Sequence, residues 1–296
     1  MENRNLLSYI FILLKGMAMG AADVVPGVSG GTIAFISGIY EELITSINNV
    51  NISLLNTLRK EGIKAFWFKL NGNFLLALLL GIGISVLSLA KLISWLMENE
   101  PIPLWSFFFG LVVASIILVG KEIKKWNLAA IIILILGAAI AFYVTKLPPS
   151  ENSASLPYLF FSGALAICAM ILPGISGAFI LVLLGSYKTV LDAVHERDLK
   201  IVITVGLGAI FGLLSFAKLL KWMFTHYKNL TLALLTGFIL GSLNKIWPWK
   251  EVLETKMFGE KIITIKDQNI SPFSFDGDPQ LISAIILALL GFSLIF

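Results

Sequence analysis

Residues 26–40 read PGVSGGTIAFISGIY, and residues 173–187 read PGISGAFILVLLGSY. The two stretches begin 147 positions apart in a chain of 296 residues, so each half of the chain carries one copy. Seven positions recur, and they pair Pro26, Gly27, Ser29, Gly30, Ile33, Gly38 and Tyr40 with Pro173, Gly174, Ser176, Gly177, Ile180, Gly185 and Tyr187. A Pro-Gly break that recurs inside two apolar segments indicates the binding site of a membrane transporter.

The composition is that of an integral membrane protein. Hydrophobic residues make up 57% of the chain, charged residues 14%, and the mean hydropathy is +0.90. Soluble domains carry about 25% charged residues. The apolar runs show no strict alternation, which favours helices over a β-barrel. The net charge of +4 comes from basic residues in short loops, where they set membrane orientation, so it does not indicate nucleic acid as a partner.

The apolar segments form two matching sets, one in residues 1–150 and one in residues 151–296. The first set covers 6–22, 31–47, 74–97, 104–120 and 128–145, and the second covers 157–172, 176–194, 201–224, 230–246 and 281–296. The correspondence extends beyond the motifs, since Lys91 matches Lys218, Gly110 matches Gly237, and Gly137 matches Gly291. We therefore expect two repeats that together form one transmembrane domain.

The Pro-Gly breaks determine whether the two repeats have the same or opposite orientations in the membrane. Proline disfavours helix at the preceding residue, so the first two segments of each half should form a helical hairpin. A re-entrant hairpin is the favoured form, and two full crossings are the alternative. With three further helices, either gives an odd count and inverted repeats, whereas a single broken crossing would give parallel ones. The predicted fold is thus an all-α polytopic membrane protein with two inverted repeats, each a Pro-Gly-broken hairpin plus three transmembrane helices.

Loop charges predict the orientation. With the N-terminus inside, the basic loops 48–73 and 121–127 lie in the cytoplasm, and the acidic loop 98–103 lies outside. Loop 195–200 carries Arg197 and Lys200 yet falls outside, so it fits the rule less well. Both termini are expected in the cytoplasm.

The residues after each Pro-Gly break predict an anion site. Serine is a favoured N-cap, and the first turn of a helix has free N–H groups and a partial positive charge. Small residues there let a phosphate approach the backbone. The predicted phosphate-binding residues are Pro26, Gly27, Ser29, Gly30, Gly31, Thr32, Pro173, Gly174, Ser176, Gly177 and Ala178. The alternative is that these glycines only permit close helix packing.

Ionisable residues near the motifs are candidates for charge compensation or coupling. Asp23 precedes the first motif, and Met170 stands at the matching place in the second half. A carboxylate beside an anion site could couple anion movement to H+ or Na+, or it could simply make a C-cap or helix–helix hydrogen bond. Lys15 lies inside an apolar segment and could pair with Asp23, Glu41 or Glu42.

Other charged residues stand at matching positions of the two repeats. Glu41 and Glu42 follow Tyr40, whereas Lys188 follows Tyr187, so the motif ends acidic in one half and basic in the other. Lys91 and Lys218 could attract phosphate from opposite membrane faces, or their side chains could snorkel to the interface. The isolated His195 and His226 predict no metal site, and we expect no cofactor.

The residues around both breaks resemble a known family. The stretch MAMGAADVVPGVSGGT at residues 17–32, continuing to Gly38-Ile39-Tyr40-Glu41, and the partner motif LPGISG at residues 172–177 resemble the PopT family of bacterial membrane proteins, once described as a domain of unknown function. The resemblance covers nearly the whole chain. It implies a translocase that returns undecaprenyl phosphate, a polyprenyl phosphate lipid carrier, across the bacterial cytoplasmic membrane for cell-wall synthesis. Nothing in the sequence indicates an oligomeric state.

Two other functions stay open on the residues alone. A transporter or channel for a small soluble anion would use the same anion site. The Pro-Gly-x-Ser pattern also resembles that of membrane-embedded lipid pyrophosphate phosphatases, which continue with Arg-Ser. Gly30 and Gly177 stand where that arginine would be. Because pyrophosphate hydrolysis needs cationic charge stabilisation, a transporter is expected rather than an enzyme.

Overall fold

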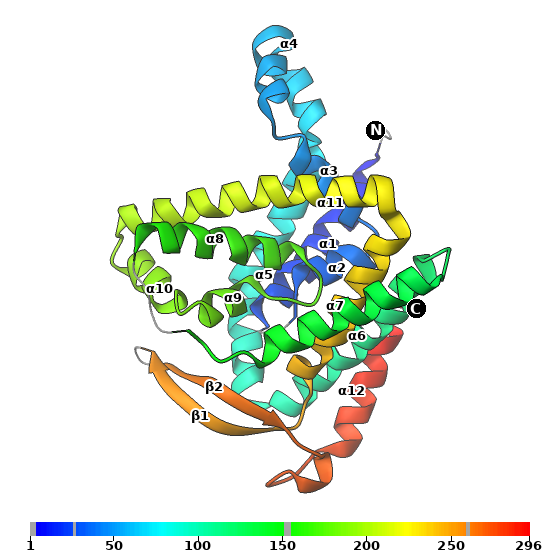
Figure 1. Cartoon of the computed structure of the whole chain (residues 1–296), viewed down its shortest axis with the longest axis vertical. Coiled ribbons are helices and arrows are strands. Elements are labelled where there is room, and N and C mark those ends of the chain that lie inside the picture. Colours follow the sequence, from blue (N-terminus) through cyan, green and yellow to red (C-terminus); the bar gives the residue numbers. More distant parts are fainter. Residues whose placement is uncertain (1–3, 26–27, 151–154, 259–260) are drawn as a thin grey trace.

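The protein is described by a computed structural model that covers residues 4–25, 28–150, 155–258 and 261–296. The helices of the first half are α1 (Leu6–Val24), α2 (Gly30–Ile36), α3 (Tyr40–Asn48), α4 (Ile52–Leu70), α5 (Gly72–Asn99), α6 (Pro101–Glu122) and α7 (Leu128–Lys146). Those of the second half are α8 (Leu156–Ile171), α9 (Gly177–Leu183), α10 (Tyr187–His195), α11 (Leu199–Ser242) and α12 (Leu281–Ser293). The 3-10 turns η1 (Leu243–Ile246) and η2 (Pro272–Ser274) flank the strands β1 (Lys250–Phe258) and β2 (Lys261–Asn269). Figure 1 shows the helices gathered in one body.

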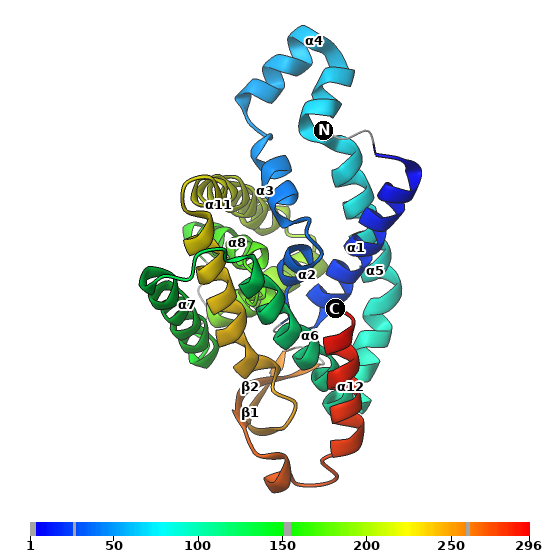
Figure 2. The ribbon, with the colours of Figure 1, turned by 90° about the vertical axis from the view of Figure 1, so that its right-hand side faces the viewer.

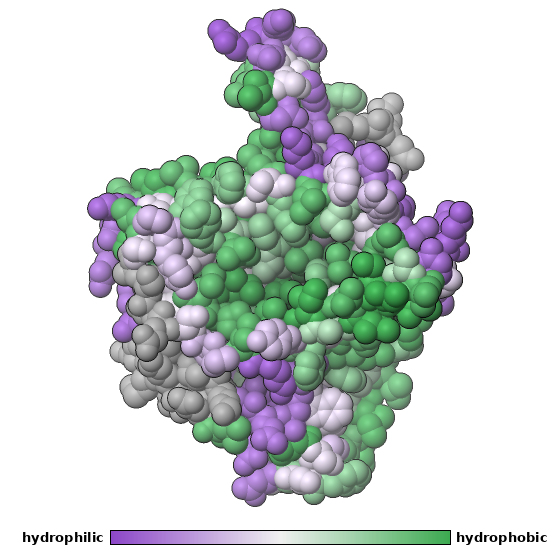
Figure 3. All heavy atoms as spheres, viewed as in Figure 1, coloured by the Kyte–Doolittle hydropathy of each residue, from purple (hydrophilic) through white to green (hydrophobic). Residues whose placement is uncertain are grey.

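The helices confirm a multi-pass membrane protein. A membrane-crossing helix needs about 20 apolar residues. Within the described residues, five helical segments meet this requirement, namely α1, Gly72–Leu89 of α5, α6, α7, and Leu199–Ile246 of α11 and η1. The pair α9 and α10, bent by 109° at the break between them, also meets it when taken together. Figure 3 shows hydrophobic residues covering the face formed by α7, α8 and α11, as expected for contact with lipid.

The two segments expected at 201–224 and 230–246 are the two arms of α11, which meet at a kink (Figure 1). Tyr227 alone departs from helical geometry, with φ −136° and ψ 44°. No proline or glycine lies between His226 and Asn229, so the helix resumes directly after the kink.

The stretch 48–73, expected as a loop, instead contains α4. Its leucine, lysine and glutamate residues favour helix, and Gly62 breaks the helix with φ +83°. The Lys69 Nζ donates to Ser53 Oγ and Thr57 Oγ1, both at 3.0 Å, which ties the two arms together. This helical hairpin projects from the body (Figure 1, top).

The mixed-charge stretch 247–280 forms a two-stranded antiparallel hairpin, an addition to the all-α architecture. The register pairs Lys250 with Asn269 at its base. Two indoles anchor the base, because Trp247 Nε1 donates to the carbonyl oxygen of Ile270 and Trp249 Nε1 to that of Pro279, both at 2.9 Å. Trp249 is buried against Ile102 at the start of α6.

The first pair of long helices in each half packs through matched glycines. Figure 2 shows α1 lying along α5. A methyl group at Gly16 of α1 would collide with the carbonyl oxygen of Leu78 on α5. At the corresponding place, a methyl group at Gly163 of α8 would collide with the carbonyl oxygen of Val205 on α11. Equivalent residues therefore make equivalent backbone contacts in the two halves.

The last helices are exchanged between the halves. A methyl group at Gly110 of α6 would collide with the carbonyl oxygen of Ala288 on α12, and one at Gly237 of α11 with that of Leu134 on α7. Gly110 and Gly237 correspond in the two halves, yet each packs on the final helix of the other half. The two halves are thus interleaved into a single domain body.

Candidate functional site: the contact between the two Pro-Gly motifs

Hydroxyl groups of the first motif bind the backbone of the second break. Ser29 Oγ donates to the carbonyl oxygens of Met170 and Leu172, both at 3.2 Å. Thr32 Oγ1 accepts the N–H of Gly174 at 3.0 Å. The structure therefore brings together two motifs that lie far apart in the sequence.

Two further residues tighten this contact at the end of α8. The Tyr40 hydroxyl, at the start of α3, donates to the carbonyl oxygen of Ile171 at 3.2 Å. A methyl group at Gly31 would lie 2.5 Å from that same oxygen. Tyr40 is 2% exposed, and its ring packs edge-on against Phe35 and Phe224. The contact is therefore buried and has no room for a larger residue at Gly31.

The start of α2 has partners within the chain. The Gly30 N–H donates to Asp23 Oδ1 at 2.7 Å, and the Gly31 N–H donates to Ser29 Oγ at 3.1 Å. A carboxylate at this end of a helix is favoured by the partial positive charge there. Asp23 of α1 thus makes a helix–helix hydrogen bond to α2, one of the roles that the sequence left open, and it does not cap the end of its own helix. Pro26 and Gly27 lie outside the described residues.

The start of α9 differs from that of α2. Ser176 is buried but makes no capping hydrogen bond to α9. Met170 lies against Gly177, with its Cβ 3.2 Å from where a glycine methyl would be, just as Asp23 lies against Gly30. The second tip therefore lacks both the serine cap and the carboxylate that occupy the first. Ala178 beside it is exposed.

The Pro173-Gly174 break packs on α11. Gly174 has φ +89°, and a methyl group there would lie 2.8 Å from the carbonyl oxygen of Phe238 and 2.9 Å from Ser242 Oγ. Only glycine adopts this conformation without strain at such a distance. Pro173 itself is buried.

The charged candidates of the first half lie around α2 and α3 rather than at the motif contact. Lys15 Nζ donates to the carbonyl oxygen of Ser37 at 2.6 Å, so the hydrogen bond goes to the end of α2 and not to any of the three acids considered. Glu42 accepts two hydrogen bonds of 2.7 Å from Arg4. Glu41 pairs with Lys228 at 2.6 Å, which joins α3 to α11.

The three remaining candidate residues are lysines, and all are exposed. Lys188 lies on α10, Lys91 on α5 and Lys218 on α11. Lys218 lines a cavity beside α3, together with Asn48. The two repeat-related lysines, Lys91 and Lys218, therefore lie in different surroundings.

A charged cluster near the second tip was missed from the sequence. Lys245 and Lys250 both contact Asp267 Oδ2, at 3.3 Å and 3.2 Å. Lys245 Nζ lies 5.7 Å from the centre of the Phe179 ring on α9, and Lys250 Nζ lies 5.5 Å from that of Trp105. The pairing of β1 with β2 creates this cluster, and no local sequence motif predicts it.

Burial changes the acid–base properties of the cluster. It lowers the pKa of Lys250 to about 8, although Asp267 acts in the opposite direction. Burial alone would raise the pKa of Asp267, but Lys250 and Lys245 outweigh it and hold that pKa below its usual range. In the described part of the chain, no group of three or more His, Cys, Asp or Glu side chains is placed to hold a metal ion.

Comparison with known proteins identifies the family. The model of the family described as undecaprenyl phosphate translocase-like matches residues 19–262. A curated polyprenyl-phosphate transporter of Vibrio cholerae serotype O1 (strain ATCC 39315 / El Tor Inaba N16961) is 48% identical over 272 residues, covering 91% of this chain and 88% of the relative. A polyprenyl-phosphate transporter of Staphylococcus aureus (strain NCTC 8325 / PS 47) is 32% identical over 254 residues, covering 80% and 85%. No solved structure matches the chain.

These matches span both Pro-Gly motifs and confirm the resemblance that the motifs indicated. The chain belongs to the undecaprenyl phosphate translocase-like family.

Proposed function

We propose that this protein is a translocase for undecaprenyl phosphate, or a similar polyprenyl phosphate, that returns the lipid carrier across the cytoplasmic membrane for cell-wall synthesis. One observation carries the proposal: in a chain of this family, Ser29 and Thr32 of the first motif bind the backbone of the second, at Leu172 and Gly174. The two breaks thus form one polar contact inside an apolar helix body. An anionic head group needs such a polar path, whereas its prenyl tail can remain in lipid.

The phosphate would bind where the motifs meet. The second tip, with Ser176, Gly177 and Ala178, is the candidate that needs no displacement of a side chain, because neither a capping serine hydroxyl nor a carboxylate bonds to the start of α9. At the first tip, the head group would have to replace Asp23 at the Gly30 N–H. The Asp23 carboxylate and the phosphate would repel each other there unless one of them is neutralised. We therefore infer that H+ or Na+ binding at Asp23 accompanies phosphate movement.

An inverted repeat would relate the contact between the two motifs to both sides of the membrane. The matched glycine contacts of Gly16 with Leu78 and Gly163 with Val205 support two equivalent halves. The 109° bend between α9 and α10 fits either a re-entrant loop or a broken span, and the proposal takes the re-entrant form. In this arrangement the two breaks enter from opposite membrane faces, and both termini lie in the cytoplasm. Each access state would then bind the phosphate through one tip better than the other, as directional transport requires.

The test is leaflet exchange in proteoliposomes that contain the purified protein and a labelled polyprenyl phosphate. Half of the outward-facing head groups should become inaccessible to an impermeant reagent, with no inorganic phosphate released. Ser29→Ala with Ser176→Ala should slow the exchange strongly. Ser88→Ala is the matched control, because Ser88 is exposed on α5 and bonds only within its own helix, to the carbonyl oxygen of Ile84.

Two results would contradict the proposal. Exchange that stays at the protein-free rate, with and without proton and sodium gradients, would rule out lipid translocation. If labelled inorganic phosphate then crossed the membrane, the protein would be a transporter of a soluble anion. Release of phosphate from a lipid pyrophosphate would instead indicate a hydrolase.

A further inference from the structure

Two neighbouring cavities lie between α3 and α11, apart from the motif contact. The first has a volume of about 160 Å³ and is lined by Glu41, Ile44 and Thr45 of α3 and by Lys221, Phe224 and Thr225 of α11. The second, about 330 Å³, is lined by the next residues along the same two helices. We call the two cavities together the α3–α11 groove.

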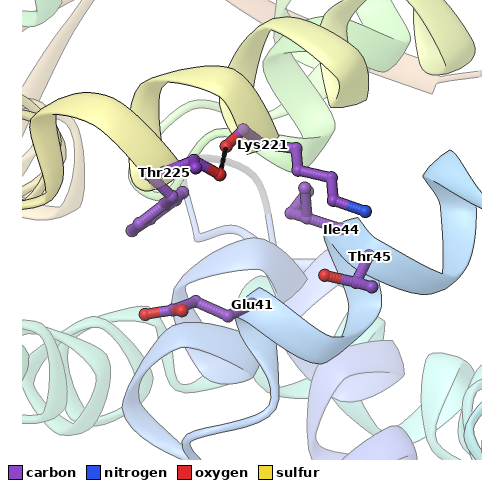
Figure 4. Close-up of a pocket in the computed structure, with 6 residues that line it drawn as sticks. Glu41, Ile44, Thr45, Lys221 and Thr225 are labelled. Atoms are coloured by element: carbon purple, nitrogen blue, oxygen red, sulfur yellow. Dashed lines mark hydrogen bonds between the residues drawn. The ribbon is translucent and has the colours of Figure 1, made fainter.

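The first cavity offers a cation and hydroxyl groups. Figure 4 shows the Lys221 ammonium on the side of Thr45, while the Glu41 carboxylate points away from it. Glu41 is paired with Lys228, so it does not neutralise Lys221. Thr225 Oγ1 donates to the carbonyl oxygen of Lys221 at 2.8 Å, so this oxygen can still accept a hydrogen bond.

The second cavity is mainly apolar, with one more cation at its edge. Ile47 lines it from α3, Val50 from the segment just after α3, and Phe211 and Leu214 from α11. Lys218 lies one turn from Lys221, so both ammonium groups can reach the junction of the two cavities. In the described residues, neither Lys218 nor Lys221 makes an ion pair, and Glu41, the acid that lines the first cavity, is paired with Lys228.

The floor of the groove connects it to the motif contact. Asn48 Nδ2 donates to the carbonyl oxygen of Ala217 at 2.7 Å, which fixes α3 on α11. Phe224, which lines the first cavity, packs against Tyr40 with ring centres 6.0 Å apart. Tyr40 in turn binds the carbonyl oxygen of Ile171 beside the second break. One buried residue thus separates the groove from the place where the motifs meet.

We propose that the α3–α11 groove is a waiting site for the polyprenyl phosphate, with the phosphate on Lys221 and Lys218 and the first isoprene units against Phe211, Leu214 and Val50. Charge complementarity and the apolar continuation of the groove identify this amphipathic occupant. The site rests on the proposed function but is distinct from the motif contact. Ser94 stands at the position in the first half that corresponds to Lys221, so the repeat does not provide a second such pair of cations. The waiting site therefore serves one end of the transport path.

The experiment measures binding and position separately. A polyprenyl phosphate with a photoreactive first isoprene unit is bound to the full-length protein in nanodiscs, and the cross-linked peptides are mapped. We expect cross-links in α3 and in Phe211–Thr225 of α11. Lys218→Gln with Lys221→Gln should weaken binding about tenfold or more, because two charge-assisted contacts are lost. Lys64→Gln, at an exposed lysine of α4 outside the groove, should leave binding unchanged.

Further variants and ligands separate the groove from the motif contact. Leu214→Trp, which fills the apolar cavity, should also weaken binding. Ser29→Ala with Ser176→Ala should retain the cross-links in α3 and α11 while transport is lost. Polyprenol without phosphate should bind at least tenfold more weakly, and inorganic phosphate at equal concentration should not displace the lipid.

The outcomes distinguish failure of this proposal from failure of the function. If the wild-type protein translocates the lipid but the double lysine variant binds it normally, or all cross-links lie outside α3 and α11, the groove is not a waiting site and the function stands. If polyprenol binds as tightly as its phosphate, the lysines do not recognise the head group, and the proposal is also wrong. If the wild-type protein neither binds nor translocates polyprenyl phosphate, both proposals fall.

Discussion

Asp23 and Gly30 are joined by a hydrogen bond of 2.7 Å from the glycine N–H to Oδ1, and a methyl group on the glycine would lie 2.5 Å from Oδ2. The end of α1 and the start of α2 are therefore locked by one carboxylate. In the proposed function, this carboxylate occupies the place that a transported phosphate would take at the Gly30 N–H.

Substitutions of Asp23 separate its charge from its hydrogen bond. Asp23→Asn keeps an oxygen acceptor for the Gly30 N–H, so its thermal stability in detergent should stay close to that of the wild type. Asp23→Ala leaves a buried N–H unpaired and should cost about 1–3 kcal/mol. Both should lose the response of lipid exchange to a pH or sodium gradient. An Asp23→Asn protein whose exchange still follows both gradients would show that coupling lies elsewhere.

The hydrogen bond between Thr32 and Gly174 predicts a second pair of results. Thr32→Val has nearly the same shape but cannot accept the Gly174 N–H, so we expect a loss of about 1–3 kcal/mol in stability. Thr32→Ser keeps the hydroxyl and should lose much less. Thermal unfolding followed by tryptophan fluorescence measures both, and equal melting temperatures for the two variants would contradict a role for this bond.

Close helix packing predicts opposite effects for two neighbouring glycines of α11. A methyl group at Gly208 would collide with the carbonyl oxygen of Phe160, whereas one at Gly206 meets nothing within 4 Å. Gly208→Ala should destabilise the protein by about 1–3 kcal/mol through overpacking. Gly206→Ala should be neutral or stabilising by up to about 1 kcal/mol, because alanine favours helix. Detergent melting curves decide the matter, and a destabilising Gly206→Ala would refute the packing.

Lys250 predicts a pH dependence of stability. Its pKa falls from 10.5 to about 8 on folding because of burial. Below pH 8 the ammonium is charged in both states, and the folded protein bears the full cost of desolvating it. Between pH 8 and 10.5 the unfolded chain binds more protons, so this residue makes stability rise with pH by up to about 3 kcal/mol. Between pH 7.5 and pH 9.5, the melting temperature of the wild type should therefore rise relative to that of Lys250→Met. If the two melting temperatures change in parallel with pH, Lys250 makes no such contribution.

Much of the architecture could be predicted because it depends on local patterns. The apolar segments, the breaks at the Pro-Gly motifs and the matched glycines follow from composition and spacing along the chain. The contact of Ser29 with Leu172 was expected only if the two hairpin tips converged, since the breaks are far apart in sequence. Its specific donors and acceptors depend on how the helices pack, which no local pattern specifies.

Other features could not be predicted for definite physical reasons. The helical arms of α4 lie in a charged stretch without the period of a buried helix, so it was expected to be a loop. The cluster of Lys245, Lys250 and Asp267 forms only after β1 and β2 pair. Lys15 has acids nearby in sequence, yet the carbonyl oxygen at the end of α2 is its hydrogen-bond partner.

The exchange of final helices has a consequence for how the protein is made. While the chain emerges from the ribosome, α6 must stay in the bilayer with the Gly110 surface uncovered until α12, which is synthesised much later, reaches it. The first half therefore depends on residues 281–293 for its own completion. A premature stop before residue 281 would leave the Gly110 surface of α6 uncovered, and such a product should be recognised and degraded by membrane proteases instead of persisting as a half-active fragment.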